Sequence, residues 1–129
     1  MTSGSHGWPV LVVEDDHEIR ESLLDILFDQ GIGAVGAVNG RDGLTKLAAA
    51  GGEISLVLLD MMMPVLDGDG FREEQLREPR FADVPVVVMS AYRDVASMAG
   101  RLGVAGYMRK PFNVAEVLNV VNLHRRQVP

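Results

Sequence analysis

Several acidic side chains follow short apolar runs of this sequence, and together they could bind a metal ion. Glu14, Asp15 and Asp16 follow one such run, and Asp60 ends another. Clustered carboxylates repel one another and resist joint ionisation, and a hard divalent cation relieves that repulsion. Mg²⁺ prefers oxygen ligands, commonly one or two carboxylates with waters and phosphate oxygens. Asp15 and Asp60 are therefore candidates for direct ligands, with Glu14 acting through a water molecule.

A phosphoryl group is the second candidate ligand of these residues. A carboxylate such as that of Asp60 can act as a nucleophile and form an aspartyl phosphate. Phosphoryl transfer then requires neutralisation of the charge on the phosphoryl oxygens. Lys110, one of only two lysines in the chain, can supply a positive charge, and the Ser90 hydroxyl can donate a hydrogen bond.

Three short apolar runs, at 10–13, 56–59 and 86–89, predict strands that are buried on both faces. They are rich in β-branched residues and too short for helices, which is typical of a parallel sheet covered by helices. Two weaker candidates, at 34–38 and 106–109, are interrupted by glycine or polar residues, as expected of strands at the edges of a sheet.

Helical patterns separate the predicted strands. Apolar residues recur at helical spacing after the strands, as in the run of Val95, Met98, Ala99 and Leu102. Asp16 is a candidate N-cap for the first helix and Asn113 for the last one, because short polar side chains can accept from the free backbone N–H groups of a helix start.

The alternation of strand and helix, repeated five times, predicts the α/β class, a doubly wound (βα)5 sandwich of the flavodoxin-like type. A parallel sheet of order 2-1-3-4-5 places the two weak strands at its edges. In such a sheet the ligand binds beyond the carboxyl ends of the strands. The acidic residues, Ser90 and Lys110 all fall at those ends, so the fold predicts that they share one site.

Length and composition narrow the class of protein. A length of 129 residues is typical of one domain. We predict a domain at 9–125, with an N-terminal tail at 1–8 and a C-terminal tail at 126–129. The N-terminal tail is either native or added for expression. The net charge of -6 disfavours direct nucleic-acid binding, and the absence of cysteine excludes disulfides and thiol chemistry. The apolar runs are too short to span a membrane, and the first residues do not form a signal peptide.

Four motifs in order resemble the receiver domain of two-component response regulators, of the chemotaxis-response-regulator type. They are Val-Val-Glu-Asp-Asp at 12–16, Leu-Leu-Asp-Met-Met-Met-Pro at 58–64 with Asp-Gly at 67–68, Met-Ser-Ala at 89–91 and Lys-Pro-Phe at 110–112. The resemblance covers residues 10 to about 123, and the strand order 2-1-3-4-5 is a known property of this family.

The resemblance implies a role for each site residue. Asp60 is then the phosphoacceptor, and Glu14 and Asp15 form the acidic pair that binds Mg²⁺ or Mn²⁺ together with Asp60 and the Met62 backbone carbonyl. Lys110 contacts the phosphate, Ser90 is the switch hydroxyl and Tyr107 the switch aromatic. The peptide bond between Lys110 and Pro111 is expected to be cis, a state that only X-Pro bonds adopt easily.

The resemblance also implies the function. We expect a cytoplasmic signalling domain that takes a phosphoryl group from a sensor histidine kinase or a histidine phosphotransfer protein. It assists its own phosphorylation and dephosphorylation and is not an enzyme acting on a separate substrate. The phosphorylated domain then switches a protein-binding surface, formed by the fourth helix, fifth strand and fifth helix, toward a downstream target or an output domain, with no direct nucleic-acid or membrane contact.

Two features depart from the family pattern. Ser90 and Lys110 are twenty residues apart, about two fewer than we expect for many members, which predicts a shorter fourth helix or shorter loops. That helix also contains Gly100 and Gly103, which would weaken it by roughly 1 kcal/mol each if both were interior. Met62 is apolar, so it cannot orient an attacking water, and we interpret the methionine run at 61–63 as packing at the sheet edge.

Other functions remain as alternatives. The fold could serve as an interaction module that is never phosphorylated, although none of the expected acidic residues nor the lysine is missing. A flavin-binding protein of similar topology would need a Ser/Thr/Gly-rich phosphate loop after the first strand, where this chain has acidic residues. A haloacid-dehalogenase-like phosphatase would need an Asp-x-Asp pattern there, which the residues Glu14, Asp15 and Asp16 do not supply.

Overall fold

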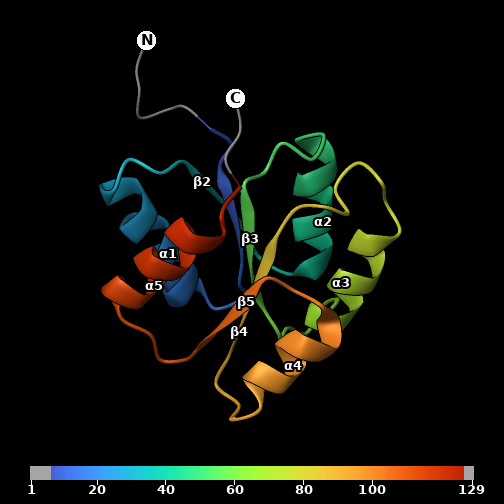
Figure 1. Ribbon diagram of the computed structural model, residues 1–129. Coiled ribbons are helices and arrows are strands. Elements are labelled where there is room, and N and C mark those ends of the chain that lie inside the picture. The colour runs from blue at the N-terminus through green and yellow to red at the C-terminus, as the bar shows by residue number, and fades with distance from the viewer. Residues whose placement is uncertain (1–6, 127–129) are drawn as a thin grey trace.

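The computed structural model describes residues 7–126, in which five strands and five helices alternate (Figure 1). The elements are β1 (Val10–Val13), α1 (His17–Asp29), β2 (Ala34–Ala37), α2 (Gly40–Ala49), β3 (Leu56–Asp60), α3 (Gly68–Leu76), β4 (Val86–Ser90), α4 (Val95–Leu102), β5 (Gly106–Arg109) and α5 (Val114–His124). No helix in this part of the chain is long and apolar enough to cross a membrane.

The strands form one parallel sheet in the order β2-β1-β3-β4-β5, which confirms the predicted fold class and topology. Every residue of β1, β3 and β4 is buried, whereas β2 and β5 at the two edges are partly exposed. The continuous apolar runs therefore belong to central strands, because both of their faces are covered by helices.

The helices cover the sheet in two layers. Figure 1 shows α1 and α5 on one side of the sheet and α2, α3 and α4 on the other. Successive residues of each strand point to opposite faces, so the core is divided in two. Val10 and Val12 pack with Leu23 of α1 and Val117 of α5, while Leu11 and Val13 join the opposite cluster.

Short polar side chains begin four of the helices. The Asp16 carboxylate accepts from Ile19 N at 2.9 Å, and the Asn113 side chain accepts from Glu116 N at 2.8 Å in a reciprocal capping box. Both predicted N-caps are thus confirmed. Helix α4 differs, because Asp94 at its N-cap position makes no capping bond.

The fourth helix ends at a glycine rather than containing two. Gly103 is the C-cap of α4 and has a φ of 64°, a left-handed conformation that costs glycine little. The predicted weakening of the helix interior therefore applies to Gly100 alone. At eight residues α4 is short, in agreement with the close spacing of Ser90 and Lys110.

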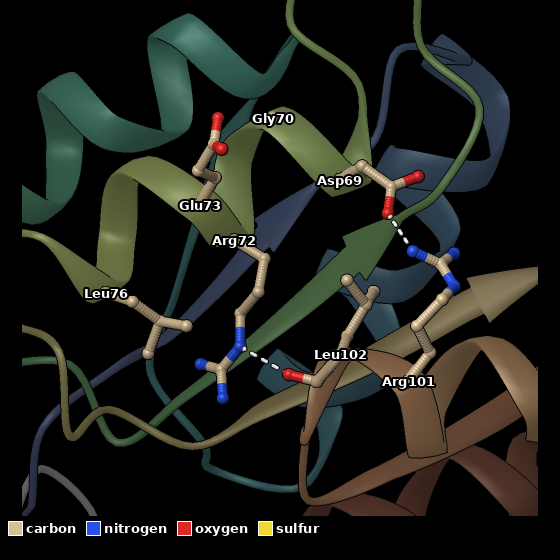
Figure 2. A pocket seen from close by; sticks show the side chains of 7 residues that line it. All are labelled: Asp69, Gly70, Arg72, Glu73, Leu76, Arg101 and Leu102. Carbon is tan, nitrogen blue, oxygen red and sulfur yellow. Dashed lines mark hydrogen bonds and ion pairs between the residues drawn. The ribbon is translucent and has the colours of Figure 1, made fainter.

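The C-terminal end of α4 is tied to α3 by Arg72. Its guanidinium donates to Leu102 O at 3.1 Å and to Gly103 O at 2.9 Å, and Arg101 pairs with Asp69 at 2.7 Å (Figure 2). These contacts surround a shallow pocket of about 350 Å³ between the two helices. The last turn of α4 is therefore fixed to its neighbour through its own free carbonyls.

Arg72 also contacts the fully buried amide of Gln75. The Gln75 Oε1 atom accepts from Arg72 at 2.8 Å, and Nε2 donates to Phe81 O at 3.1 Å and Val84 O at 3.0 Å. This amide donates to two carbonyls of the segment between α3 and β4. Phe81 O also accepts from Val84 N at 3.2 Å, whereas Gln75 is the donor that satisfies Val84 O.

We predict that Gln75→Leu destabilises the chain although it adds apolar volume. The Val84 carbonyl, left without its donor, costs about 1–3 kcal/mol, so the free energy of unfolding falls by an amount of that order. Urea denaturation measures it, with Gln30→Leu as the control because Gln30 is exposed. A loss no larger than in the control would contradict a stabilising role for this amide.

Candidate functional site

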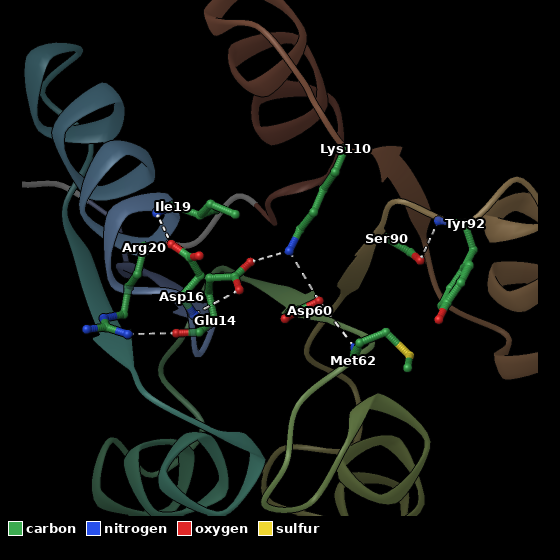
Figure 3. Close-up of polar contacts among 9 residues, drawn as sticks. All are labelled: Glu14, Asp16, Ile19, Arg20, Asp60, Met62, Ser90, Tyr92 and Lys110. Carbon is green, nitrogen blue, oxygen red and sulfur yellow. Dashed lines mark hydrogen bonds and ion pairs between the residues drawn. The ribbon is translucent and has the colours of Figure 1, made fainter.

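Glu14 lies at the carboxyl end of β1 and is fully buried. Its backbone N–H donates to Ala37 O at 3.1 Å, which extends the pairing of β1 with β2 by one residue. Its carboxylate accepts from Lys110 Nζ at 2.7 Å and from Asp16 N at 3.2 Å (Figure 3). A buried charge is stable only with such partners, so Glu14 has a defined position in the pocket.

Asp60 ends β3 beside Glu14, and only 3% of it is exposed. Because Val13 pairs with Leu59, the residues that follow each of them come to the same edge of the sheet. The Asp60 Oδ1 atom lies 3.3 Å from Lys110 Nζ and accepts from Met62 N at 3.2 Å. Figure 3 shows the lysine between the two carboxylates.

Lys110 directly follows β5, and its backbone N–H donates to Ser90 O at 2.8 Å. Its side chain reaches across to Glu14 and Asp60. Burial by itself lowers the pKa of Lys110, but the hydrogen bond to Glu14 and the charges of both carboxylates outweigh burial and raise it. The ammonium is thus held in its charged form. The peptide bond from Lys110 to Pro111 is cis.

Asp60 titrates far from its ordinary range. Burial, followed by the hydrogen bond and the negative charge of the neighbouring Glu14, raises the pKa of Asp60 to about 7, although Lys110 favours the charged form. Burial is the largest cause, and an excess of negative charge adds to it, because one ammonium contacts two buried carboxylates. Cationic charge added at this point would return Asp60 to its carboxylate form.

The acidic pocket suits a hard cation. Glu14, Asp15 and Asp60 each offer one oxygen, and these oxygens lie within 4.8 Å of one another. Asp15 is exposed at the rim of the pocket, while the other two are buried. Oxygen donors only, with an uncompensated negative charge, fit Mg²⁺ or Mn²⁺ rather than a soft metal.

The loop after Asp60 is held by close packing. Met61 and Met63 are buried, whereas the Met62 side chain is 55% exposed. Gly68 at the start of α3 donates to Met61 O at 3.2 Å, and a Cβ atom on Gly68 would lie 2.9 Å from the Met61 Cα atom. Only glycine fits there, so α3 fixes the backbone that carries Met62 next to Asp60.

Ser90 and Tyr107 lie outside the carboxylate cluster. Ser90 ends β4 and is buried, and its hydroxyl accepts from Tyr92 N at 3.0 Å in the turn that leads toward α4. Tyr107 is 46% exposed on the edge strand β5, so its ring is not packed inward in this state. The structure therefore brings together Glu14, Asp15, Asp60 and Lys110, with Ser90 on the neighbouring strand end.

One residue near the site was not predicted from the sequence. Arg20 in the first turns of α1 donates to the Glu14 carbonyl at 2.8 Å (Figure 3). The sequence gives only a weak indication of this contact, because an arginine six residues after Glu14 can equally well face solvent.

Comparison with known proteins identifies the class. A family model described as the response regulator receiver domain matches residues 10–122, so the chain belongs to that family. It is 31% identical over 126 residues to protein PilG of Pseudomonas aeruginosa, covering 96% of this chain and 92% of PilG. It is 38% identical over 117 residues to the response regulator protein FleR of the same organism, covering 89% of this chain and 24% of FleR.

Solved structures agree on the fold. Chemotaxis protein CheY4 of Vibrio cholerae superimposes with a TM-score of 0.82 at 24% identity, covering 92% of this chain and 98% of that one. The chain spans less than half the length of several curated relatives that it matches. It is a receiver domain, and its family is that of signalling proteins of two-component systems.

We predict that Asp60→Asn stabilises the metal-free chain increasingly from about pH 4 to pH 7. In this window the folded wild type keeps a proton on Asp60 that the unfolded chain has released, so its free energy of unfolding falls as the pH rises. Asparagine does not titrate. The advantage of the variant therefore grows through the window and levels off above it, at no more than roughly 4 kcal/mol.

Urea denaturation in EDTA at a series of pH values measures this difference. Asp25→Asn, which removes an exposed carboxylate of α1, is the control for the loss of one surface charge. Parallel pH profiles of wild type and Asp60→Asn would show that Asp60 does not carry the shifted titration.

Proposed function

We propose that this receiver domain accepts a phosphoryl group on Asp60 from a phosphohistidine of a sensor histidine kinase or a histidine phosphotransfer protein. The observation that carries the proposal is the buried carboxylate of Asp60, 3.3 Å from Lys110 and clustered with Glu14 and Asp15. The carboxylate is a nucleophile, the lysine is a fixed positive charge, and both lie at the open edge of the sheet.

In the reaction, an Asp60 oxygen forms a bond to phosphorus and the bond between phosphorus and the histidine nitrogen breaks. The electron pair of that bond returns to the imidazole. Lys110 can transfer its contact from the Asp60 carboxylate to a phosphoryl oxygen, because its Nζ already lies between the two acids. Mg²⁺ or Mn²⁺, held by Asp15, Asp60 and the Met62 carbonyl with Glu14 through water, would neutralise further charge on the phosphoryl oxygens.

The phosphorylated state would differ from the present one at Ser90 and Tyr107. The Ser90 hydroxyl, now an acceptor for Tyr92 N, can instead donate to a phosphoryl oxygen. We expect this movement to free space behind β4 and the ring of Tyr107, now 46% exposed, to turn into it. Phosphorylation would thereby shift a two-state equilibrium of the surface formed by α4, β5 and α5.

That surface would bind a downstream protein target or an output domain. The matched region is less than half of several relatives, so an output domain in the same protein belongs to the proposal as much as a separate target. We place the process in the cytoplasm, with no direct nucleic-acid or membrane contact and no separate substrate. We keep 9–125 as the proposed domain bounds. Just outside them, the Arg126 guanidinium lies 4.8 Å from the centre of the Trp8 ring in a cation–π contact.

We predict that Asp60→Asn abolishes phosphorylation by acetyl phosphate in the presence of Mg²⁺. The amide is neutral and a far weaker nucleophile than the carboxylate. Intact-mass spectrometry should show one added phosphoryl group on the wild type and none on the variant. EDTA should suppress the wild-type reaction as well.

Asp67→Asn is the matched control for this experiment. Asp67 lies in the same loop but caps α3, and asparagine caps a helix as well as aspartate does. Phosphorylation should persist in Asp67→Asn. Uptake of phosphate by Asp60→Asn would mean that another residue is the phosphoacceptor.

We predict that Ser90→Ala separates phosphorylation from the switch. Addition of beryllofluoride with Mg²⁺ should shift the amide and ring resonances of Tyr107 in the wild type. In Ser90→Ala the same additions should still shift Asp60 and Met62 but leave Tyr107 largely unmoved, because the hydroxyl that couples them is absent. Ser97→Ala, an exposed serine of α4, is the control. Equal Tyr107 shifts in Ser90→Ala and wild type would exclude Ser90 as the coupling residue.

A further inference from the structure

Arg20 links the first helix to the backbone of the acidic pocket. It is half-buried in the first turns of α1, and its Nη1 atom donates to the Glu14 carbonyl at 2.8 Å (Figure 3). Its Nη2 atom lies 3.1 Å from His17 Nδ1, which must accept because a guanidinium only donates. The planar guanidinium is therefore held at two points on the side of the pocket opposite to Lys110.

The carbonyl that Arg20 contacts belongs to the peptide between Glu14 and Asp15. Glu14 is held on its other sides by Ala37 through its backbone N–H and by Lys110 and Asp16 N through its carboxylate. Within residues 7–126, no donor contacts the carboxylate of Asp15. The position of that side chain therefore depends on the orientation of the peptide that precedes Asp15. The hydrogen bond from Arg20 to the Glu14 carbonyl fixes this orientation.

The stem of Arg20 lies in a space kept open by glycine. A Cβ atom on Gly36 of β2 would lie 3.2 Å from Arg20 Cδ and 3.2 Å from Leu24 Cδ1. The arginine thus crosses the edge strand closely on its way to Glu14. The backbone of Arg20 is anchored as well, because its N–H donates to Asp16 O at 2.9 Å.

We propose that Arg20 is a positioning residue for the cation site, an inference that rests on the proposed Mg²⁺ site. It does not touch the cation. By fixing the peptide between Glu14 and Asp15, it keeps the Asp15 carboxylate beside Asp60 against the repulsion between like charges. Without the guanidinium, the acidic loop relaxes by moving Asp15 outward, and the site loses a ligand before any cation arrives.

The test is an MgCl₂ titration of the metal-free chain, followed through the backbone amide resonances of Asp15, Asp60 and Met62. Arg20→Met keeps an unbranched apolar stem over Gly36 but removes the donors. We expect its Mg²⁺ dissociation constant to rise about tenfold or more, as for other residues that orient metal ligands. Arg20→Lys retains one donor and should fall between Arg20→Met and wild type.

Arg72→Met is the matched control. The Arg72 guanidinium also donates hydrogen bonds to backbone carbonyls, but it does so at the C-terminal end of α4. This variant therefore loses comparable bonds outside the acidic pocket. Its Mg²⁺ affinity should equal that of the wild type. The amide spectrum of each metal-free variant reports whether the fold is retained.

The outcomes separate the two ideas. Wild-type Mg²⁺ affinity in a folded Arg20→Met, or an equal loss in Arg20→Met and Arg72→Met, would overturn the positioning role while leaving the metal site intact. If the wild type itself shows no saturable shift at Asp15, Asp60 and Met62, the metal site is wrong and the role of Arg20 is overturned with it.

Discussion

The contact of one ammonium with two buried carboxylates is the interaction on which the site depends. Lys110 contacts both Glu14 and Asp60, and burial of two carboxylates without a cation between them would carry a large desolvation cost. One positive charge does not balance two negative ones, and Asp15 adds a third at the rim. The pocket is therefore short of positive charge, a condition that favours a divalent cation there.

This arrangement requires the register of the parallel sheet. Val13 pairs with Leu59, so the next residues along β1 and β3 are neighbouring acids. A shift of one residue would turn the acids to another face of the sheet and expose apolar residues in their place. Lys110 leaves β5, which is separated from β3 by β4, and only a long flexible side chain can cross that strand to reach both acids.

The two ends of α4 are held differently, which bears on how a change at Asp60 could spread. The C-terminal end is fixed to α3 through Arg72 and through the Arg101–Asp69 pair. The N-terminal end lacks a capping side chain and follows the turn in which Ser90 accepts from Tyr92 N. A rearrangement that begins at Ser90 therefore meets less resistance at the near end of the helix than at the far end.

The features that depend on neighbouring residues could be predicted from the amino-acid sequence. Continuous apolar runs identified the three central strands, Asp16 and Asn113 identified two helix starts, and the weak strands identified the edges of the sheet. Since the carboxyl ends of parallel strands always meet at one edge, the set of Glu14, Asp15, Asp60, Ser90 and Lys110 could also be chosen in advance.

The contacts of each member of that set depend on the tertiary structure. It buried Glu14 and exposed Asp15, although they are adjacent, and it raised the pKa of Asp60 by enclosing it with Glu14. It also brought Arg20 to the Glu14 carbonyl and Gln75 to the carbonyls before β4. Glu14 and Lys110 are 96 residues apart, so their distance depends on how every intervening unit packs, which no local pattern encodes.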